Sequence, residues 1–204
     1  EFGEWNRVFA TPTQKYEFFS TRLAEQLGDT PAVRDALLER LGVAARGDIA
    51  CLPHYEPIPD AEPGQSFTLC SYKTMTHAEG RGANQPHLQE LYGVQFDRCW
   101  EAWVELHPED AKHLGVIEND MVWLSSKGGR VSARVVLHPG IQRGVASVPF
   151  EYGHTAWGRW AKDRGQNVNS LFESVPNEPL AGGIAWYQCR VAIAKAQESE
   201  ARDG

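Results

Sequence analysis

Short strand-like segments separated by turn residues fill the sequence after residue 66, and this pattern constrains the fold more than any other feature. The segments are rich in β-branched and aromatic residues, and glycine, asparagine and proline fall between them. Such a series, interrupted by one or two short helices, predicts a small β-barrel with helical inserts. The strand-like segments cover residues 67–72, 103–106, 121–125, 130–137, 145–149 and 185–193.

Local signals refine this prediction. Residues 107–115 are expected to form a compact helix, because Pro108 suits a first helical turn and Gly115 is a natural stop. Asn119 predicts a tight turn before the next strand, since asparagine tolerates left-handed backbone better than most residues. Residues 127–129, Lys-Gly-Gly, lie between two strand-like segments and predict a β-hairpin.

The first 64 residues have a different character. Residues 8–20 contain a turn and a short aromatic run that resembles a strand. A helix is expected between the N-cap candidate Thr30 and Gly42, and four prolines in residues 52–64 predict an extended connector. We therefore divide the chain into an N-terminal segment that ends a preceding domain, a barrel domain and a polar tail: residues 1–64, 65–195 and 196–204.

Composition excludes several classes of protein. The 204 residues include 20 Lys and Arg against 27 Asp and Glu, a net charge of −7 without a basic block. This balance argues against non-specific nucleic-acid binding. No apolar run approaches the roughly 18–20 residues of a membrane helix, so we expect no direct membrane span. The four cysteines form no Cys-x-x-Cys pair and the histidines show no ligand spacing, so no iron–sulfur cluster or metal site is predicted within this chain.

A polar loop follows the first strand of the expected barrel. It combines hydroxyls, a lysine, an arginine and glycines, the groups that hold phosphates through donors, positive charge and close backbone approach. The spacing matches neither the phosphate-loop nor the Rossmann glycine pattern, so a solvated surface loop is the alternative. The candidate residues are Ser71, Tyr72, Lys73, Thr74, Thr76, His77 and Asn84.

A second group of candidate residues lies after the strand at 145–149. Glycines beside amides and an imidazole suit recognition of a heterocycle edge, because asparagine offers both a donor and an acceptor. The alternative is ordinary turn chemistry, since glycine and asparagine are also common turn formers. The candidates are Tyr152, Gly153, His154, Asn167 and Asn169.

Taken in order, these segments resemble the C-terminal dinucleotide-binding domain of the molybdopterin oxidoreductases, the dimethyl sulfoxide reductase family. Residues 11–20 resemble a family segment in which Thr-Pro precedes a Lys and an aromatic run, although Gln14 stands where glycine is usual. Residues 106–125 resemble the family's most recognisable run, with Asn119 again in place of glycine. Residues 141–148 resemble the strand after the hairpin, and the segments at 152–154 and 167–169 resemble closing cofactor contacts.

The resemblance implies a mainly β fold with short helices, a six-stranded double-psi β-barrel preceded by a small helical or extended segment. It also implies a bis(molybdopterin guanine dinucleotide) cofactor carrying molybdenum or tungsten. The loop at residues 71–77, with Asn84, would contact a guanine dinucleotide arm through phosphate or base edge. The second group of candidates, Tyr152, Gly153, His154, Asn167 and Asn169, would contact a pterin or its phosphate.

Two family features do not belong to this stretch of the family pattern: the cysteine motif for a [4Fe–4S] cluster and the protein ligand of the metal. We therefore expect a fragment, an isolated domain or a separate subunit that is not catalytic alone, and the N-terminus without a Met favours this expectation. The expected partners are the remainder of the catalytic chain and an iron–sulfur electron-transfer subunit. Two locations are open: the periplasm, if the larger enzyme is exported by a twin-arginine signal, or the cytoplasm.

The leading functional hypothesis is a cofactor-binding domain that positions the molybdopterin guanine dinucleotide for two-electron redox chemistry. The main alternative is a cofactor-free structural module of a respiratory complex that keeps the same fold. A third hypothesis, a free-standing barrel with an unrelated binding role, is disfavoured by residues 11–20. Retention of polar loop residues favours the first over the second: Lys73, Thr74, Asn84, His154 and Asn169.

Overall fold

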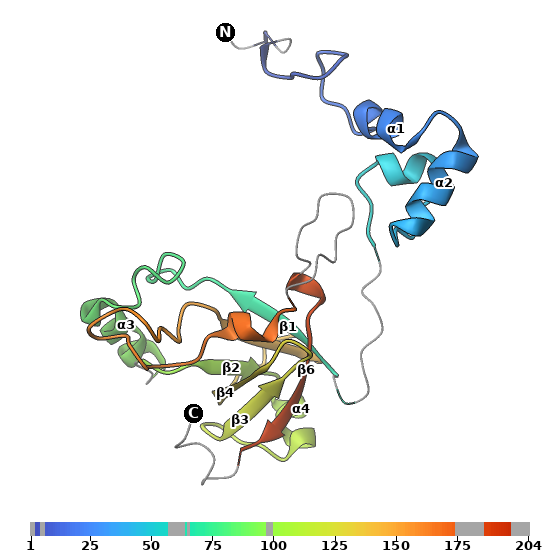
Figure 1. Ribbon diagram of the computed structural model, residues 1–204. Coiled ribbons are helices and arrows are strands. Elements are labelled where there is room, and N and C mark those ends of the chain that lie inside the picture. Colours follow the sequence, from blue (N-terminus) through green and yellow to red (C-terminus); the bar gives the residue numbers. More distant parts are fainter. Residues whose placement is uncertain are drawn as a thin grey trace. The chain divides into compact units, whose positions relative to one another are not determined.

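The computed structural model of the chain describes residues 3–4, 7–56, 64, 66–96, 100–173 and 186–196 (Figure 1). The chain forms two compact units, which are described separately below. The first consists of Glu1–Ile58 with Pro176–Gly183, and the second of Pro59–Val175 with Ile184–Gly204. None of the helices in the described ranges combines the length and apolar character needed to cross a membrane.

Helices α1 (Thr21–Leu27) and α2 (Pro31–Arg40) and a 3₁₀ turn, η2 (Gly47–Cys51), build the first unit. The Thr30 hydroxyl accepts from the Val33 amide at 3.4 Å, so the helix expected after Thr30 is confirmed with its cap. Helix α1 was not expected from the sequence. These elements enclose a small apolar core of Leu27, Leu38, Val43, Ala50 and Cys51.

The strand suggested by the aromatic run in residues 8–20 is not present, and that interpretation was wrong. These residues form turns and bends, and Gln14 takes a left-handed φ of 55°. A left-handed φ explains why glycine suits this position in the family pattern. The aromatic rings pack on one another instead of pairing in a sheet: Tyr16 lies 5.9 Å from Phe9 and 4.9 Å from Phe18, edge to face.

A closed six-stranded barrel forms the second unit, which confirms the predicted mainly β fold with short helices. Around the barrel the strands follow the order β1-β5-β2-β4-β3-β6. The pairs β1·β5 and β2·β4 are parallel and the other four pairs are antiparallel. The strands are β1 (Phe67–Tyr72), β2 (Trp103–Leu106), β3 (Met121–Ser125), β4 (Arg130–Leu137), β5 (Val145–Pro149) and β6 (Arg190–Lys195).

Alternating apolar residues fill the barrel. In β4, Val131, Ala133 and Val135 are buried while their neighbours point outward, as the two-residue period of a strand requires. The predicted hairpin at residues 127–129 joins β3 to β4. The segment expected as a strand at 185–193 begins instead with a 3₁₀ turn, η4 (Trp186–Gln188), and only its later residues pair in β6.

Two helices flank the barrel, on different sides of it (Figure 1). Helix α4 (Pro108–Leu114) ends at Gly115, whose φ of 68° confirms the predicted stop. Asp110 in α4 is buried; its carboxylate accepts from the Gly144 amide at 2.7 Å and from Arg143 Nε at 3.1 Å. This contact ties α4 to the start of β5. Helix α3 (Pro86–Phe96) was not expected from the sequence.

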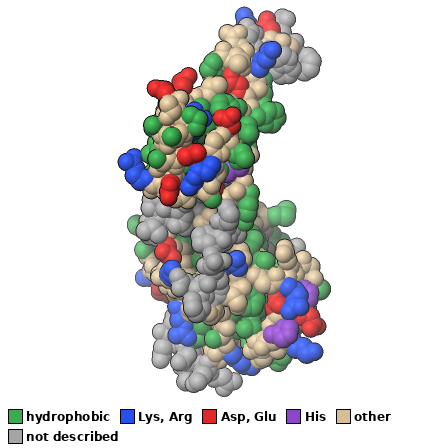
Figure 2. Space-filling model, turned by 90° about the vertical axis from the view of Figure 1, so that its right-hand side faces the viewer, with side chains coloured by type: hydrophobic (Ala, Val, Ile, Leu, Met, Phe, Trp, Pro, Cys, Tyr) green, Lys and Arg blue, Asp and Glu red, His purple; other side chains and the backbone are tan. Residues whose placement is uncertain are grey.

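Acidic and basic side chains are interspersed on the surface that Figure 2 shows, with hydrophobic side chains between them. The second unit contains ion pairs of such side chains. Lys195 Nζ lies 2.7 Å from Asp120 Oδ2, and Arg134 pairs with Glu101. Such exposed pairs contribute little stability, on the order of 0–1 kcal/mol each.

Candidate functional site

A cavity of about 630 Å³ opens in the second unit where β1 and β5 end. These strands run parallel, with Tyr72 opposite Pro149, so the residues that follow them emerge side by side. The Phe150 amide donates to the Tyr72 carbonyl at 3.3 Å, which continues the pairing to the rim. The lining residues are Ser71, Tyr72, Lys73, Phe150, Asn169, Phe172, Glu173 and Trp186.

The chemistry of this lining suits a ligand that joins a planar heterocycle to phosphate. Phe150, Phe172 and Trp186 supply aromatic walls, on which flat rings pack well. Lys73 and the Ser71 hydroxyl supply donors and positive charge for phosphate oxygens. The volume lies within the roughly 300–1,000 Å³ that ligand pockets usually offer.

Four predicted site residues line this cavity together: Ser71, Tyr72, Lys73 and Asn169. The Tyr72 hydroxyl is bound by side chains of β2, since it donates to Glu105 Oε1 at 2.8 Å and accepts from Trp103 Nε1 at 3.1 Å. Burial, together with the nearby Glu105 carboxylate, raises the pKa of Tyr72 well above its usual value. Tyr72 therefore stays a neutral phenol at physiological pH.

The predicted loop residue Thr74 faces the protein interior. Its amide donates to Glu151 Oε2 at 2.8 Å, and its hydroxyl donates to the same oxygen. Thr76 lies in the turn that follows, close to Gly82, where an added Cβ would stand 2.4 Å from the Thr76 carbonyl oxygen. The Thr74 amide and hydroxyl and the Thr76 backbone thus help to shape the loop.

His77 is buried beneath this loop. Its Nδ1 lies 3.7 Å from Glu151 Oε2, and its ring packs edge to face on Tyr152 with centroids 5.2 Å apart. Tyr152 in turn packs on Trp103 at 5.7 Å. Burial lowers the pKa of His77; the Glu151 carboxylate opposes this shift and His154 adds to it. The His77 imidazole is therefore neutral at physiological pH.

Acidification should destabilise the chain through His77. Folding lowers the pKa of His77 from its usual value of 6.5. At a pH just below 6.5, the unfolded chain therefore binds a proton at His77, whereas the folded chain does not. The free energy of unfolding should therefore fall as the pH drops below 6.5, by up to about 1.4 kcal/mol per pH unit for one proton. Urea unfolding between about pH 5.5 and about pH 7.5 measures this slope. A His77→Gln variant should show a flatter profile, and an equal slope in both proteins would contradict the assignment.

Asn84 joins the two predicted loops. Its Oδ1 accepts from the Trp160 amide at 2.8 Å and from the Ala161 amide at 3.0 Å. His154 makes isolated β-bridges to Lys162 and Arg164 in the same second loop. The His154 bridges stay within the second loop, whereas the Asn84 bonds join the loop at residues 71–84 to the loop at residues 152–169. A direct contact of Asn84 or His154 with a ligand stays a prediction.

Gly153 and Asn167 are in contact through their backbones. A Cβ at Gly153 would lie 2.1 Å from the Asn167 amide nitrogen, so the close approach requires glycine. The Asn167 side chain accepts from the Asn169 amide at 3.0 Å and caps the 3₁₀ turn η3 (Val168–Leu171). This cap presents Asn169 to the cavity.

The sequence interpretation missed several lining residues: Phe150, Phe172, Glu173 and Trp186. A signal existed for Phe150, which directly follows a predicted strand. Trp186 was assigned to a strand, and the approach of Phe172 and Glu173 to the cavity depends on the closed barrel. Glu151, which organises the first loop, was not among the predicted site residues.

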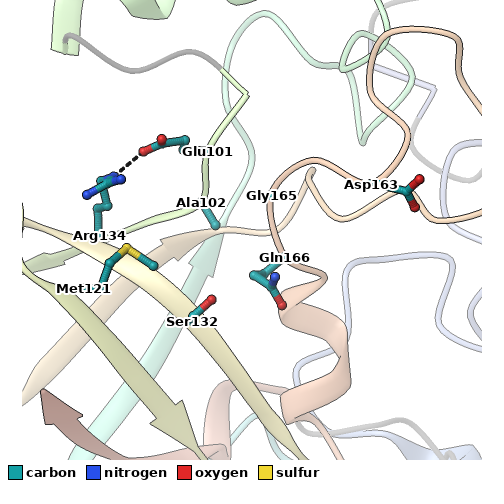
Figure 3. A pocket seen from close by; sticks show the side chains of 8 residues that line it. All are labelled: Glu101, Ala102, Met121, Ser132, Arg134, Asp163, Gly165 and Gln166. Carbon is teal, nitrogen blue, oxygen red and sulfur yellow. Dashed lines mark hydrogen bonds and ion pairs between the residues drawn. The ribbon is translucent and has the colours of Figure 1, made fainter. Parts of the chain in front are cut away.

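A second, smaller cavity of about 200 Å³ has a polar lining. Figure 3 shows Arg134 and Glu101 directed at one another on one side of it, with Gln166 and Ser132 on another. The residues that line it include none of the predicted site residues. The larger cavity is therefore the candidate site.

Comparison with known proteins agrees with this geometry. The family model described as the Molydopterin dinucleotide binding domain matches residues 74–190, more than half of the chain. The chain belongs to this family. The match confirms the resemblance found in the sequence, and it includes both loops of this molybdopterin dinucleotide-binding domain except for the first three residues, Ser71, Tyr72 and Lys73.

Relatives of this molybdopterin dinucleotide-binding domain are much longer proteins. The molybdopterin-containing subunit of the arsenate respiratory reductase of Chrysiogenes arsenatis is 32% identical over 82% of this chain and 22% of the relative. A molybdopterin-binding-like subunit of menaquinone reductase from Nitratidesulfovibrio vulgaris is 35% identical over 47% of this chain and 14% of the relative. The chain thus spans about a fifth or less of these relatives.

Among solved structures, acetylene hydratase from Pelobacter acetylenicus has a similar fold, with a TM-score of 0.57. The similarity covers 92% of this chain and 24% of that chain, at 16% sequence identity. At this identity the comparison supports the fold alone. It agrees with the closed barrel described above.

Proposed function

We propose that the chain binds a molybdopterin guanine dinucleotide in the cavity at the ends of β1 and β5. The cavity carries this proposal, because it places Lys73 and Ser71 beside aromatic walls within one space of about 630 Å³. Lys73 and Ser71 would hold phosphate oxygens, and Phe150 and Trp186 would pack on a planar ring. Asn169 would bind a heterocycle edge through its amide.

When bound, the molybdenum- or tungsten-carrying cofactor supplies two-electron redox chemistry. This chain's residues bind and orient it. The neutral Tyr72 phenol lines the cavity. Trp103 is buried and supports Tyr72 from behind, since it donates to both the Tyr72 hydroxyl and Glu105. Tyr72 is the last residue of β1 and lies between Ser71 and Lys73 in the chain, so its hydrogen bonds to β2 help to place both neighbours.

The named relatives are subunits several times longer than this chain, so we propose that it works as part of a larger oxidoreductase subunit. An iron–sulfur electron-transfer subunit is the proposed further partner. The second candidate function is the cofactor-free structural module. One relative is named a molybdopterin-binding-like subunit, and the similarity to it supports this second candidate.

Replacing Lys73 with alanine should weaken binding of guanosine diphosphate, a probe for the nucleotide arm, about tenfold, because a charge-assisted phosphate contact is lost. The loss should shrink at high salt, since the Lys73 side chain is 60% exposed and screened. Isothermal titration of the 204-residue chain measures the affinity. Lys112→Ala, an exposed lysine of α4, is the matched control and should bind like the unchanged chain. Equal losses in both variants would contradict a specific role for Lys73.

A further inference from the structure

A fully buried carboxylate lies directly beneath the polar loop. The Glu151 side chain has no exposed surface. Its Oε2 accepts from the Thr74 amide at 2.8 Å and from the Thr74 hydroxyl, and its Oε1 accepts from the Glu79 amide at 3.1 Å. Burial of a charged group is unfavourable unless several hydrogen bonds compensate, and here both oxygens have loop donors.

The loop needs such a restraint because its backbone is unusual. Ala78, Glu79 and Gly80 follow one another with φ values of 46°, 60° and 86°. Left-handed backbone is unfavourable for the two non-glycine residues, so the turn persists only where the surroundings hold it. The hydrogen bond from the Glu79 amide to Glu151 lies at the centre of this run.

The restrained turn also controls a residue of the cavity. Lys73 lines the cavity and is covalently adjacent to Thr74, which Glu151 holds. The Lys73 ammonium also pairs with the Glu79 carboxylate, and Glu151 holds the amide of that same residue. Two of the neighbours of Lys73, Thr74 along the chain and Glu79 across the ion pair, are therefore held by one buried side chain.

We propose that Glu151 is a positioning residue that holds the 74–79 turn and thereby places Lys73 at the cavity, so that it sets ligand affinity without touching the ligand. This inference rests on the proposed function of the cavity. Glu151 is suited to the role because it follows Phe150, itself a lining residue, and so connects the loop to the end of β5.

Glu151→Gln tests the proposal with little change of shape. An amide presents one oxygen and one NH₂ group, so in either orientation a donor faces a backbone N–H, that of Thr74 or that of Glu79. We expect binding of guanosine diphosphate to weaken about tenfold, and the amides of Thr74 and Glu79 to exchange hydrogen faster in the free protein. The faster exchange reports on the turn itself and needs no ligand.

Asp110→Asn is the matched control. Asp110 is likewise a buried carboxylate that accepts from a backbone amide, that of Gly144, but it lies at the opposite end of β5 from the cavity. This variant should lose stability yet keep the affinity of the unchanged chain. A comparable loss of affinity in both variants would reduce Glu151 to a purely structural role and overturn the proposal.

The outcomes separate the two claims. If the unchanged chain binds guanosine diphosphate and Glu151→Gln binds it within twofold, the positioning role is overturned while the proposed function stands. If the unchanged chain does not bind the probe, the proposed function fails first and the positioning role with it.

A second variant, Thr74→Val, keeps the proposal testable if Glu151→Gln does not fold. It removes only the hydrogen bond from the Thr74 hydroxyl to Glu151, and we expect about a threefold loss of affinity. Unchanged affinity in that variant would overturn the proposal.

Discussion

Replacing Gly153 with alanine should destabilise the chain by roughly 2–5 kcal/mol, the largest loss we expect from a single added methyl group. The new Cβ would stand 2.1 Å from the Asn167 amide nitrogen and 2.4 Å from the Gln166 carbonyl carbon. Both are backbone atoms and cannot rotate away. The backbone φ of 82° adds strain, because an alanine disfavours left-handed conformation.

Gly144→Ala provides the control for that strain. Gly144 has a similar φ of 75°, but nothing lies within 4 Å of an added Cβ. The free energy of unfolding of Gly144→Ala should therefore fall only by the cost of the φ strain, about 1–2 kcal/mol. Urea unfolding of both variants isolates the steric part as their difference. If Gly153→Ala were no less stable than Gly144→Ala, the close backbone contact of Gly153 with Gln166 and Asn167 would be contradicted.

Trp103→Ala should destabilise the chain by about 3–5 kcal/mol, because it removes the largest fully buried side chain of the barrel unit. The change leaves a cavity next to Tyr72 and Tyr152 and takes a donor from the partly buried Tyr72 hydroxyl. It should also weaken guanosine diphosphate binding, since the lining residue Tyr72 loses the side chain that supports it. Thermal or urea unfolding gives the stability, and titration gives the affinity.

Trp103→Phe separates packing from hydrogen bonding. It keeps much of the ring volume but removes the Nε1 donor, so we expect a loss of only about 1 kcal/mol from the hydrogen bond, with some further loss of packing. A loss equal to that of Trp103→Ala would show that the hydrogen bonds to Tyr72 and Glu105, rather than packing, account for the stability that Trp103 provides.

The parts of the fold that local chemistry determines could be predicted from the sequence. Strand β4 alternates buried and outward residues, and α4 carries its proline start and glycine stop. Helix α3 was missed because glycine interrupts its apolar residues, at Gly93. The aromatic run at residues 8–20 has strand composition, but its rings pack on each other and no described strand lies beside it.

The site was only partly predictable for a related reason. Ser71, Tyr72 and Lys73 follow a strand in a recognisable polar loop, and they do line the cavity. The role of Glu151 depends on donors 77 and 72 residues away along the chain, which no local pattern shows. Trp186 reaches the cavity because the chain returns there before β6 closes the barrel.

The cofactor content of the larger subunit in which we propose that this chain works tests the central claim most directly. Purified protein would be denatured with acid, and the released guanine nucleotide, pterin, molybdenum and tungsten would be quantified. We predict guanine nucleotide and pterin in stoichiometric amounts with one of the two metals, and a marked loss of all of them in a Lys73→Ala variant that stays folded. An intact, folded protein with neither guanine nucleotide nor pterin would contradict the account and favour the cofactor-free structural module.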